Sequence, residues 1–336
     1  MKAARLAVAF LGLHPERRRE LCDRFGGPEG MVDAARRGVV PGVGPEALLT
    51  AAGRQEQMLA AGVRPIFLGD PGYPGLLAQI GDPPDVLFVR GELPAAPTVA
   101  VVGTRRSTAY GRGLARAFGR AIAAAGWALC SGLARGIDGE AHRGTLEAGG
   151  QGVGVLGCGP DVVYPREHAA LMAGLAASGA VVTEYPPGTA PHGWRFPPRN
   201  RIISGLSRAV VVVEAGVTGG ALVTAARAAE QGREVFAVPG DVDREASVGC
   251  NLLIRDGAIP VLGADDLIAA LGLVLGPPRP RTTPEAQLQV PDSGIALEDL
   301  AARLGLDGAA FTAWLGRAEL SGAIRVVAGR IFPGAG

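Results

Sequence analysis

Short apolar segments that alternate with helical stretches are the feature that most constrains the fold of this chain. Six such segments follow one another: TVAVVG from Thr98, WALC from Trp127, GVGVLG from Gly152, AVVTE from Ala180, AVVVVEAG from Ala209 and EVFAVPG from Glu234. Strands that are apolar on both faces are typical of parallel sheets covered by helices on each side. The pattern therefore predicts an α/β fold with a Rossmann-like parallel sheet as its core.

The remaining segments predict smaller units around this core. The expected organisation is a small helical domain (SAM-like or helix-hairpin-helix-like) at 1–62, a Rossmann-like domain at 63–275, a Pro-rich linker at 276–294 and a winged-helix-like domain at 295–336. The winged helix is predicted from the order helix, turn, helix and hairpin. The turn PGVG at Pro41 could hold a phosphate on its amides or simply connect two helices.

The charges of the chain are unevenly distributed although their sum is close to zero. Lys and Arg number 33 and Asp and Glu number 32, so a globally basic nucleic-acid binder is excluded. Two stretches, one between Glu92 and Asp138 and one between Glu184 and Glu214, nevertheless contain arginines and no carboxylate. Both pass through glycine-rich turns at the ends of predicted strands, where open α/β sheets bind their ligands. An anionic ligand that carries phosphates is predicted.

The first stretch contains two candidate phosphate-binding turns. Free amides at a helix start and planar guanidinium groups favour phosphate. The candidates are Gly103, Thr104, Arg105 and Arg106 in the first turn, and Ser131, Gly132 and Arg135 in the second. Asp138 and His142 share one helix face there. They form either a helix N-cap with a buried polar residue or a carboxylate–imidazole pair, and the cap is preferred.

The second stretch, HGWRFPPRNRIISGLSR from His192, interleaves aromatic and cationic side chains. Rings that stack on bases, next to guanidinium groups for phosphates, are what single-stranded nucleic acids require. The candidates are Arg195, Phe196, Arg199, Asn200 and Arg201. Alternatively, Trp194 and Phe196 anchor the loop in the core. A further strand-to-helix turn at Thr218, Gly219 and Gly220 either approaches a phosphate or allows close packing.

The sequence gives little support for a dinucleotide site, a Walker-type phosphate site, a metal site or a membrane span. GVGVLG has the letters of a dinucleotide fingerprint, but its glycines lie within a predicted strand and do not open a helix. Lys2 is the only lysine, which excludes a Walker-type lysine. The four cysteines are far apart, so neither a disulfide framework nor a zinc site is expected, and a cytoplasmic protein is predicted. No apolar run reaches the length of a membrane span. We expect no metal, no cofactor and no catalytic residue.

The order of these motifs resembles the DNA-processing protein A (DprA/Smf) family. The resemblance covers about residues 63–270 and rests on VVGTRRSTAYG, SGLARGIDGEAHRGTLEAG, VLGCGPDVVYP, TEYPPGTAP, FPPRNRIISGLS, GGALVTAARAAEQGREVFAVPG and GCNLLIRDGA. It implies a homodimeric, non-enzymatic protein that binds single-stranded DNA during natural transformation, protects it and loads the recombinase RecA onto it. By motif, Gly103–Arg105 resembles the first DNA-contacting loop and Phe196–Arg201 the segment that helps line the same pocket. One departure is Thr218-Gly219-Gly220, where the family commonly has Ser-Gly-Ser.

Two other functions are kept as alternatives. The segment GGALVTAARAAEQGR also resembles the phosphate-binding turn of nucleotide phosphoribohydrolases, in which case Glu214 or Asp138 would assist cleavage of a nucleoside monophosphate. A nucleotide-sensing adaptor would instead bind mononucleotides tightly and single-stranded DNA weakly. The dimer surface, the face that contacts RecA and the role of the winged helix cannot be placed from the sequence.

Overall fold

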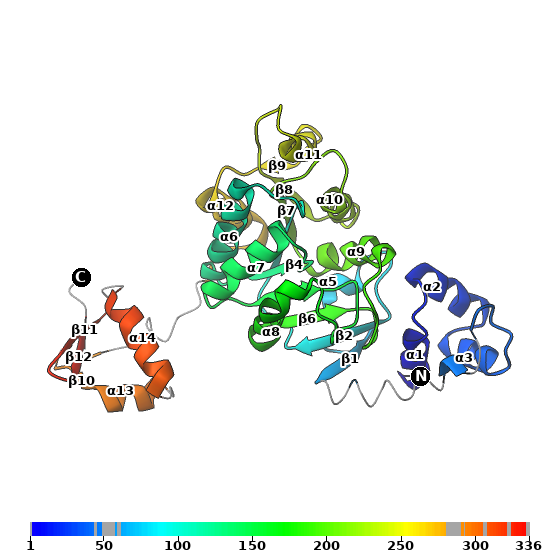
Figure 1. The fold of residues 1–336 in the computed structure, drawn as a ribbon, viewed down its shortest axis with the longest axis horizontal. Helices are drawn as coiled ribbons and strands as arrows, with labels where there is room; N and C mark the ends of the chain where they lie inside the picture. Colours follow the sequence, from blue (N-terminus) through cyan, green and yellow to red (C-terminus); the bar gives the residue numbers. More distant parts are fainter. Residues whose placement is uncertain are drawn as a thin grey trace. The chain divides into compact units, whose positions relative to one another are not determined.

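The computed structural model describes residues 2–43, 46–48, 58, 62–279, 290–291, 293–304, 308–320 and 324–333. It divides into two compact units, Met1–Arg279 and Pro280–Gly336, which are described separately (Figure 1). Most of the turn that begins at Pro41 and most of the predicted linker lie outside the described residues. No helix among the described residues is long and apolar enough to cross a membrane.

A nine-stranded sheet forms the centre of the first unit, in the order β1-β2-β6-β5-β4-β3-β7-β8-β9. The strands are β1 (Val63–Phe67), β2 (Val86–Gly91), β3 (Thr98–Val102), β4 (Ala128–Ser131), β5 (Gly152–Val155), β6 (Ala180–Thr183), β7 (Ala209–Val212), β8 (Glu234–Ala237) and β9 (Ile259–Pro260). Neighbouring strands from β6 through β3 to β9 are parallel. The six apolar segments are β3 to β8, which confirms the predicted α/β core.

Helices cover both faces of this sheet. They are α5 (Gly75–Ala78), α6 (Ala109–Ala124), α7 (Ile137–Glu147), α8 (Ala169–Ser178), α9 (Phe196–Leu206), α10 (Gly220–Glu230), α11 (Glu245–Arg255) and α12 (Ala264–Leu275). Alternate residues of β3 enter different cores: Val99 packs with α6, α7 and α12, whereas Ala100 packs with α5, α9 and α10. Gly154, from the rejected fingerprint, lies within β5, where a Cβ would come 2.4 Å from Leu133. The glycine therefore serves packing.

The sheet is not entirely parallel, because β1 and β2 extend it as an antiparallel pair. The sequence shows no strand pattern there, since Pro65 and several Pro-Gly turns interrupt the apolar positions. β1 is an edge strand, where a proline removes no essential ladder bond. The helices α1 (Lys2–Phe10), α2 (Pro15–Arg24) and α3 (Pro28–Arg36) precede it. Phe10 of α1 packs edge-to-face on Phe88 of β2, with ring centroids 5.7 Å apart.

The second unit consists of helices and a small antiparallel sheet. Its elements are β10 (Ile295–Ala296), α13 (Leu297–Leu304), α14 (Gly308–Leu320), β11 (Ile324–Val327) and β12 (Arg330–Pro333), with strand order β10-β12-β11. The hairpin turn uses Ala328 and Gly329, both with positive φ, as a two-residue turn of the primed type requires. The helices and hairpin follow one another as expected, and the assignment as a winged helix stays a prediction.

Candidate functional site

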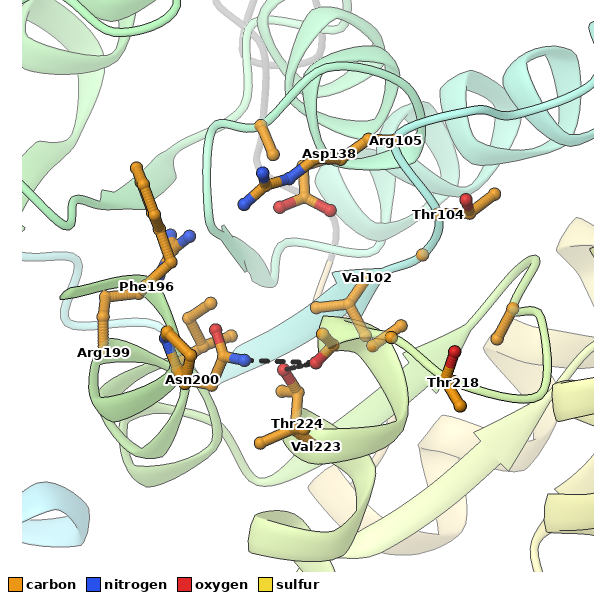
Figure 2. Close-up of a pocket in the computed structure, with 18 of the residues that line it drawn as sticks. Val102, Thr104, Arg105, Asp138, Phe196, Arg199, Asn200, Thr218, Val223 and Thr224 are labelled. Carbon is orange, nitrogen blue, oxygen red and sulfur yellow. Dashed lines mark hydrogen bonds between the residues drawn. The ribbon is translucent and has the colours of Figure 1, made fainter. Parts of the chain in front are cut away.

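The strand order reverses between β3 and β7, and a cavity of about 600 Å³ opens there at the carboxyl ends of the strands. This switch point is where open α/β sheets bind ligands. Ten of the predicted site residues line the cavity: Gly103, Thr104, Arg105, Arg106, Phe196, Arg199, Asn200, Thr218, Gly219 and Gly220. Figure 2 shows Arg105 and Asp138 above the cavity and Asn200 and Thr224 below it. The two acid-free stretches therefore converge on one site.

The loop between β3 and α6 is fixed by a carboxylate from the end of β7. The amide of Thr108 donates to Glu214 Oε2 at 2.9 Å, and its hydroxyl donates to Oε1 at 2.5 Å. The same hydroxyl accepts from the amide of Gly111 at 3.0 Å and so caps α6. Contrary to expectation, the start of α6 is occupied by the protein's own carboxylate. Phosphate would instead meet the exposed side chains of Arg105 and Arg106.

An aromatic–cation stack forms one wall of the cavity. The guanidinium carbon of Arg105 lies 5.1 Å from the Phe196 ring centroid, and that of Arg199 lies 5.8 Å away. Tyr164 packs against the same ring at 5.5 Å between centroids. Phe196 is half-buried and faces the cavity, so it can both anchor the loop and offer part of its ring to a base.

Arg199 is buried, and the backbone around it holds it in place. Its Nη1 donates to the carbonyl of Gly132 at 2.7 Å and to that of Val155, while its Nε has no partner among the described residues. The Gly132 amide donates to Asp138 Oδ2 at 3.0 Å, so it is not free for the phosphate predicted there. Burial lowers the pKa of Arg199 and raises that of Asp138, while each charge opposes the shift in the other. Asp138 offsets part of the positive charge of the cavity.

Neither reading of Asp138 and His142 holds. The N-cap of α7 is Gly136, so Asp138 is not the cap; its carboxylate fastens the Gly132 loop. Both ring nitrogens of His142 are buried without a hydrogen-bond partner in the described structure, and burial lowers the pKa of His142 to about 3. A neutral imidazole without a partner is a packing residue and not half of a catalytic pair.

The turn that opens α10 forms another wall of the cavity. Gly219 is the N-cap and provides no side chain to cap the helix. Asn200 Nδ2 and Thr224 Oγ1 both donate to the carbonyl of Gly220, at 3.1 and 3.0 Å (Figure 2). Asn200 therefore ties α9 to α10. No side chain in the described part of the chain accepts from the amides that begin α10, and such amides favour an anion.

Five predicted residues lie outside this cavity. Gly132 and Arg135 line a smaller recess behind Phe196, where Arg135 forms an ion pair with Glu167. The hydroxyl of Ser131 donates to the carbonyl of Val101 at 2.6 Å and is buried.

Arg195 and Arg201 serve the fold. Arg195 lies over the rings of Trp194 and Tyr185 at 4.7 and 5.3 Å and donates to a backbone carbonyl. Arg201 is 3% exposed and contacts Glu184 at 2.7 and 3.0 Å. Because these guanidinium groups are committed to the protein, we revise the phosphate contacts predicted for them. Trp194, which is 42% exposed, packs on His14 before α2 at 5.2 Å between ring centroids.

Sequence reasoning missed several residues of the site. Tyr164 lines both the cavity and the recess, and Val223 and Thr224 line the cavity from α10. The sequence signal for Tyr164 was its place in VLGCGPDVVYP, one of the motifs that resemble the DprA/Smf family. Within the described residues, no cluster of three or more His, Cys, Asp or Glu side chains could hold a metal ion.

Comparisons with known proteins agree with this geometry. The sequence model of the family described as DNA recombination-mediator protein A matches residues 64–272. Protein Smf of Synechocystis is 43% identical over 61% of this chain and 53% of its own length, and Protein Smf of Escherichia coli is 46% identical over 59% and 54%. DNA processing protein DprA of Bacillus subtilis is 42% identical over 62% of this chain and 72% of its own. The chain thus spans about half the length of the two Smf relatives.

Two solved structures share the fold. DNA processing protein A from Streptococcus pneumoniae superposes with a TM-score of 0.65 at 32% identity, covering 78% of this chain and 95% of that one. The protein of the same name from Helicobacter pylori, described with its single-stranded DNA binding mode, gives 0.57 at 25% identity over 62% and 95%. The family match covers more than half of the chain and includes every strand of its parallel core. The chain therefore belongs to the DNA recombination-mediator protein A family.

Proposed function

We propose that this chain binds single-stranded DNA at the cavity between β3 and β7, with little sequence preference. The observation that carries the proposal is the half-buried Phe196 ring stacked against Arg105 on a cavity wall. A ring that can accept any base, next to cations that can accept phosphate, suits a single strand and cannot be reached by the stacked bases of a duplex. The Helicobacter pylori relative, described as binding single-stranded DNA, supports the same ligand.

We further propose that the protein is not an enzyme. The two carboxylates suggested for nucleotide cleavage both have structural partners, since Glu214 holds Thr108 and Asp138 holds the Gly132 loop. An acid or base for glycosidic cleavage must be within hydrogen-bond reach of the substrate. Incubation with AMP or CMP at high protein concentration is expected to release no free base, and measurable release would favour the phosphoribohydrolase alternative.

The biological role proposed for this binding is that of a recombination mediator. In the cytoplasm of a naturally transforming cell, a homodimer would protect incoming single-stranded DNA and load RecA onto it. The names of the family and of the DprA relatives support this role. RecA loading is tested by the rate of RecA filament formation on strands coated with single-strand-binding protein, with and without this chain. Sedimentation of the purified protein tests the dimer.

Fluorescence anisotropy with labelled oligo-dT tests the binding itself. Arg105 and Arg106 line the cavity with exposed side chains, whereas Arg199 is buried, so about two phosphate contacts and a log–log salt slope of about −1.4 are expected. Arg105→Ala should weaken binding at least about tenfold and make the slope shallower by about 0.7, with the melting temperature unchanged because the side chain is exposed.

Arg208→Ala is the matched control. Arg208 belongs to the second acid-free stretch and is exposed, but it precedes β7 at the opposite end of the strand from the cavity. Its replacement should leave affinity within about twofold. An equal loss of affinity in Arg105→Ala and Arg208→Ala would show that binding depends on the overall positive charge of the surface and would contradict the proposed site. Displacement of the DNA by micromolar AMP would favour the nucleotide-sensing adaptor.

A further inference from the structure

Tyr110 is a large aromatic side chain on the outer surface of α6 with no visible role in the fold. It is 60% exposed, and the described structure gives it no ring contact, cation contact or hydrogen bond. The other aromatic residues near the site differ, because Tyr164, Trp194 and Phe196 all pack against another ring. Because most of the ring is exposed, Tyr110 gains little from burial on folding, and the ring is free to receive a ligand.

The backbone under Tyr110 is held rigidly. Tyr110 is the second residue of α6, and the neighbouring Thr108 is both its cap and the partner of Glu214. Gly111 faces inward so closely that a Cβ would lie 2.2 Å from the Glu214 carboxyl carbon. The tight contact at Gly111 therefore fixes the first turn and leaves Tyr110 outside. Because the backbone is already fixed, stacking on the ring has to order only the Tyr110 side chain and not the segment that carries it.

The surroundings of Tyr110 are positively charged. Arg106 lies four residues before it, in the β3–α6 loop, and lines the cavity, and Arg112 follows two residues after Tyr110. Both side chains are exposed, and neither has an ion-pair partner among the described residues; Arg112 Nη1 donates only to the carbonyl of Ser107, at 2.6 Å. Arg116 and Arg120, further along the helix, are instead paired with Glu147. Unpaired positive charge is thus confined to the end of α6 that borders the cavity.

We propose that Tyr110 is a second base-stacking position, which receives the nucleotide next to the one held in the cavity, with Arg106 and Arg112 facing the intervening and following phosphates. This inference rests on the proposed function, because it requires a single strand in the cavity. Tyr110 would extend, beyond the β3–α6 loop, the combination of an aromatic ring and nearby arginines that Phe196 and Arg105 form in the cavity, although no guanidinium group among the described residues contacts the Tyr110 ring itself. The strand would leave the cavity over this loop and continue along the start of α6.

Binding measured against oligonucleotide length tests the proposal. Stacking of one base on an aromatic ring changes affinity by about fivefold or more. Tyr110→Ala should therefore bind longer oligo-dT at least about fivefold more weakly than the wild type. It should equal the wild type on the shortest oligo-dT that binds, because that ligand fills only the cavity. Tyr110→Phe keeps the ring and should bind every length as the wild type does.

Photo-crosslinking identifies the contact directly. Oligo-dT with one thymine replaced by 5-iodouracil, at each position in turn, is irradiated in complex with the full chain and digested with trypsin. The adduct is expected on peptide 107–112, STAYGR, in which Tyr110 is the only aromatic residue. It should appear for the nucleotide adjacent to the one that crosslinks to Phe196 and disappear in Tyr110→Ala.

The outcomes separate the two proposals. If the wild type binds, Arg105→Ala weakens binding and Tyr110→Ala is unchanged at all lengths, the cavity function stands and the Tyr110 proposal is wrong. An equal loss for Tyr110→Ala at every length would also overturn it, because the ring would then serve the cavity itself. If the wild type does not bind oligo-dT, both proposals fail.

Discussion

Replacement of Arg201 by methionine is expected to destabilise the fold and leave DNA contacts intact. Glu184 is 1% exposed and is held by Arg201 at 2.7 and 3.0 Å and by Arg18 of α2 at 3.2 Å. Removal of one partner of a buried ion pair costs about 3–5 kcal/mol, because the other charge is left uncompensated. Since Arg18 remains, we expect the lower end, about 3 kcal/mol, from urea denaturation at pH 7.

The pH dependence of this loss gives a second measurement. Burial raises the pKa of Glu184, but the charges and hydrogen bonds of Arg201 and Arg18 outweigh it, so its pKa lies below the ordinary 4.5. A carboxyl with a lowered folded pKa contributes stability above its unfolded pKa and loses it as the pH falls toward the folded value. Arg201→Met removes most of that lowering. The difference in stability between wild type and variant should therefore be largest above about pH 5 and narrow below 4.5.

Two results would refute this reasoning. A loss below about 1 kcal/mol at pH 7 would mean that Arg18 alone compensates the buried charge of Glu184. A stable Arg201→Met variant that binds oligo-dT tenfold more weakly would restore the phosphate role that the sequence suggested. Arg208→Ala serves again as the control, because replacement of an exposed arginine should change stability by less than about 0.5 kcal/mol.

Two further predictions concern the supports of the site. His142→Leu should unfold at the same or a higher urea concentration than the wild type at pH 7, because it removes two buried ring nitrogens that lack partners. It should also remove part of the stability loss on acidification, since His142 binds a proton below pH 6.5 when unfolded but only near pH 3 when folded; an unchanged pH profile would contradict the burial argument. Thr108→Ala removes the cap of α6 and should cost about 1 kcal/mol in thermal unfolding and weaken DNA binding, whereas Thr108→Ser should retain both. Equal behaviour of the alanine and serine variants would show that the hydroxyl does not hold the loop.

The sequence predicts the parallel core well because that core leaves a local signal. Strands β3 to β8 are short apolar segments, and each can be recognised without knowledge of its neighbours. β1 contains Pro65, and β9 is only two residues long, Ile259–Pro260, so neither shows the apolar run that identifies the other strands. The order in which strands pair, which places the cavity between β3 and β7, follows from the chirality of the crossovers and not from any one segment.

The site is predictable only in part, because pairing partners come from distant positions. The acid-free stretches correctly brought Arg105, Phe196 and Arg199 to one place. The stretches contain no carboxylate, yet Glu147 from α7 neutralises Arg116, and Glu184, just before the second stretch, neutralises Arg201. A count of charges along the chain cannot show which arginines are paired through space. Burial and partners therefore separate phosphate ligands from structural cations.

The packing of α1 on the sheet has a consequence for how this protein can be divided. Leu6 and Phe10 share one buried cluster with Phe67 and Phe88, and Arg5 binds the carboxylate of Asp85 at 3.0 Å. A fragment that begins near residue 62 would expose this apolar cluster next to β1, the edge strand of the sheet, and exposed apolar edge strands promote aggregation. Chimeras with other members of the family should accordingly exchange α1 together with β1 and β2. The junction of such a chimera should be placed after β2, because α1, β1 and β2 then come from the same protein and keep their shared apolar cluster.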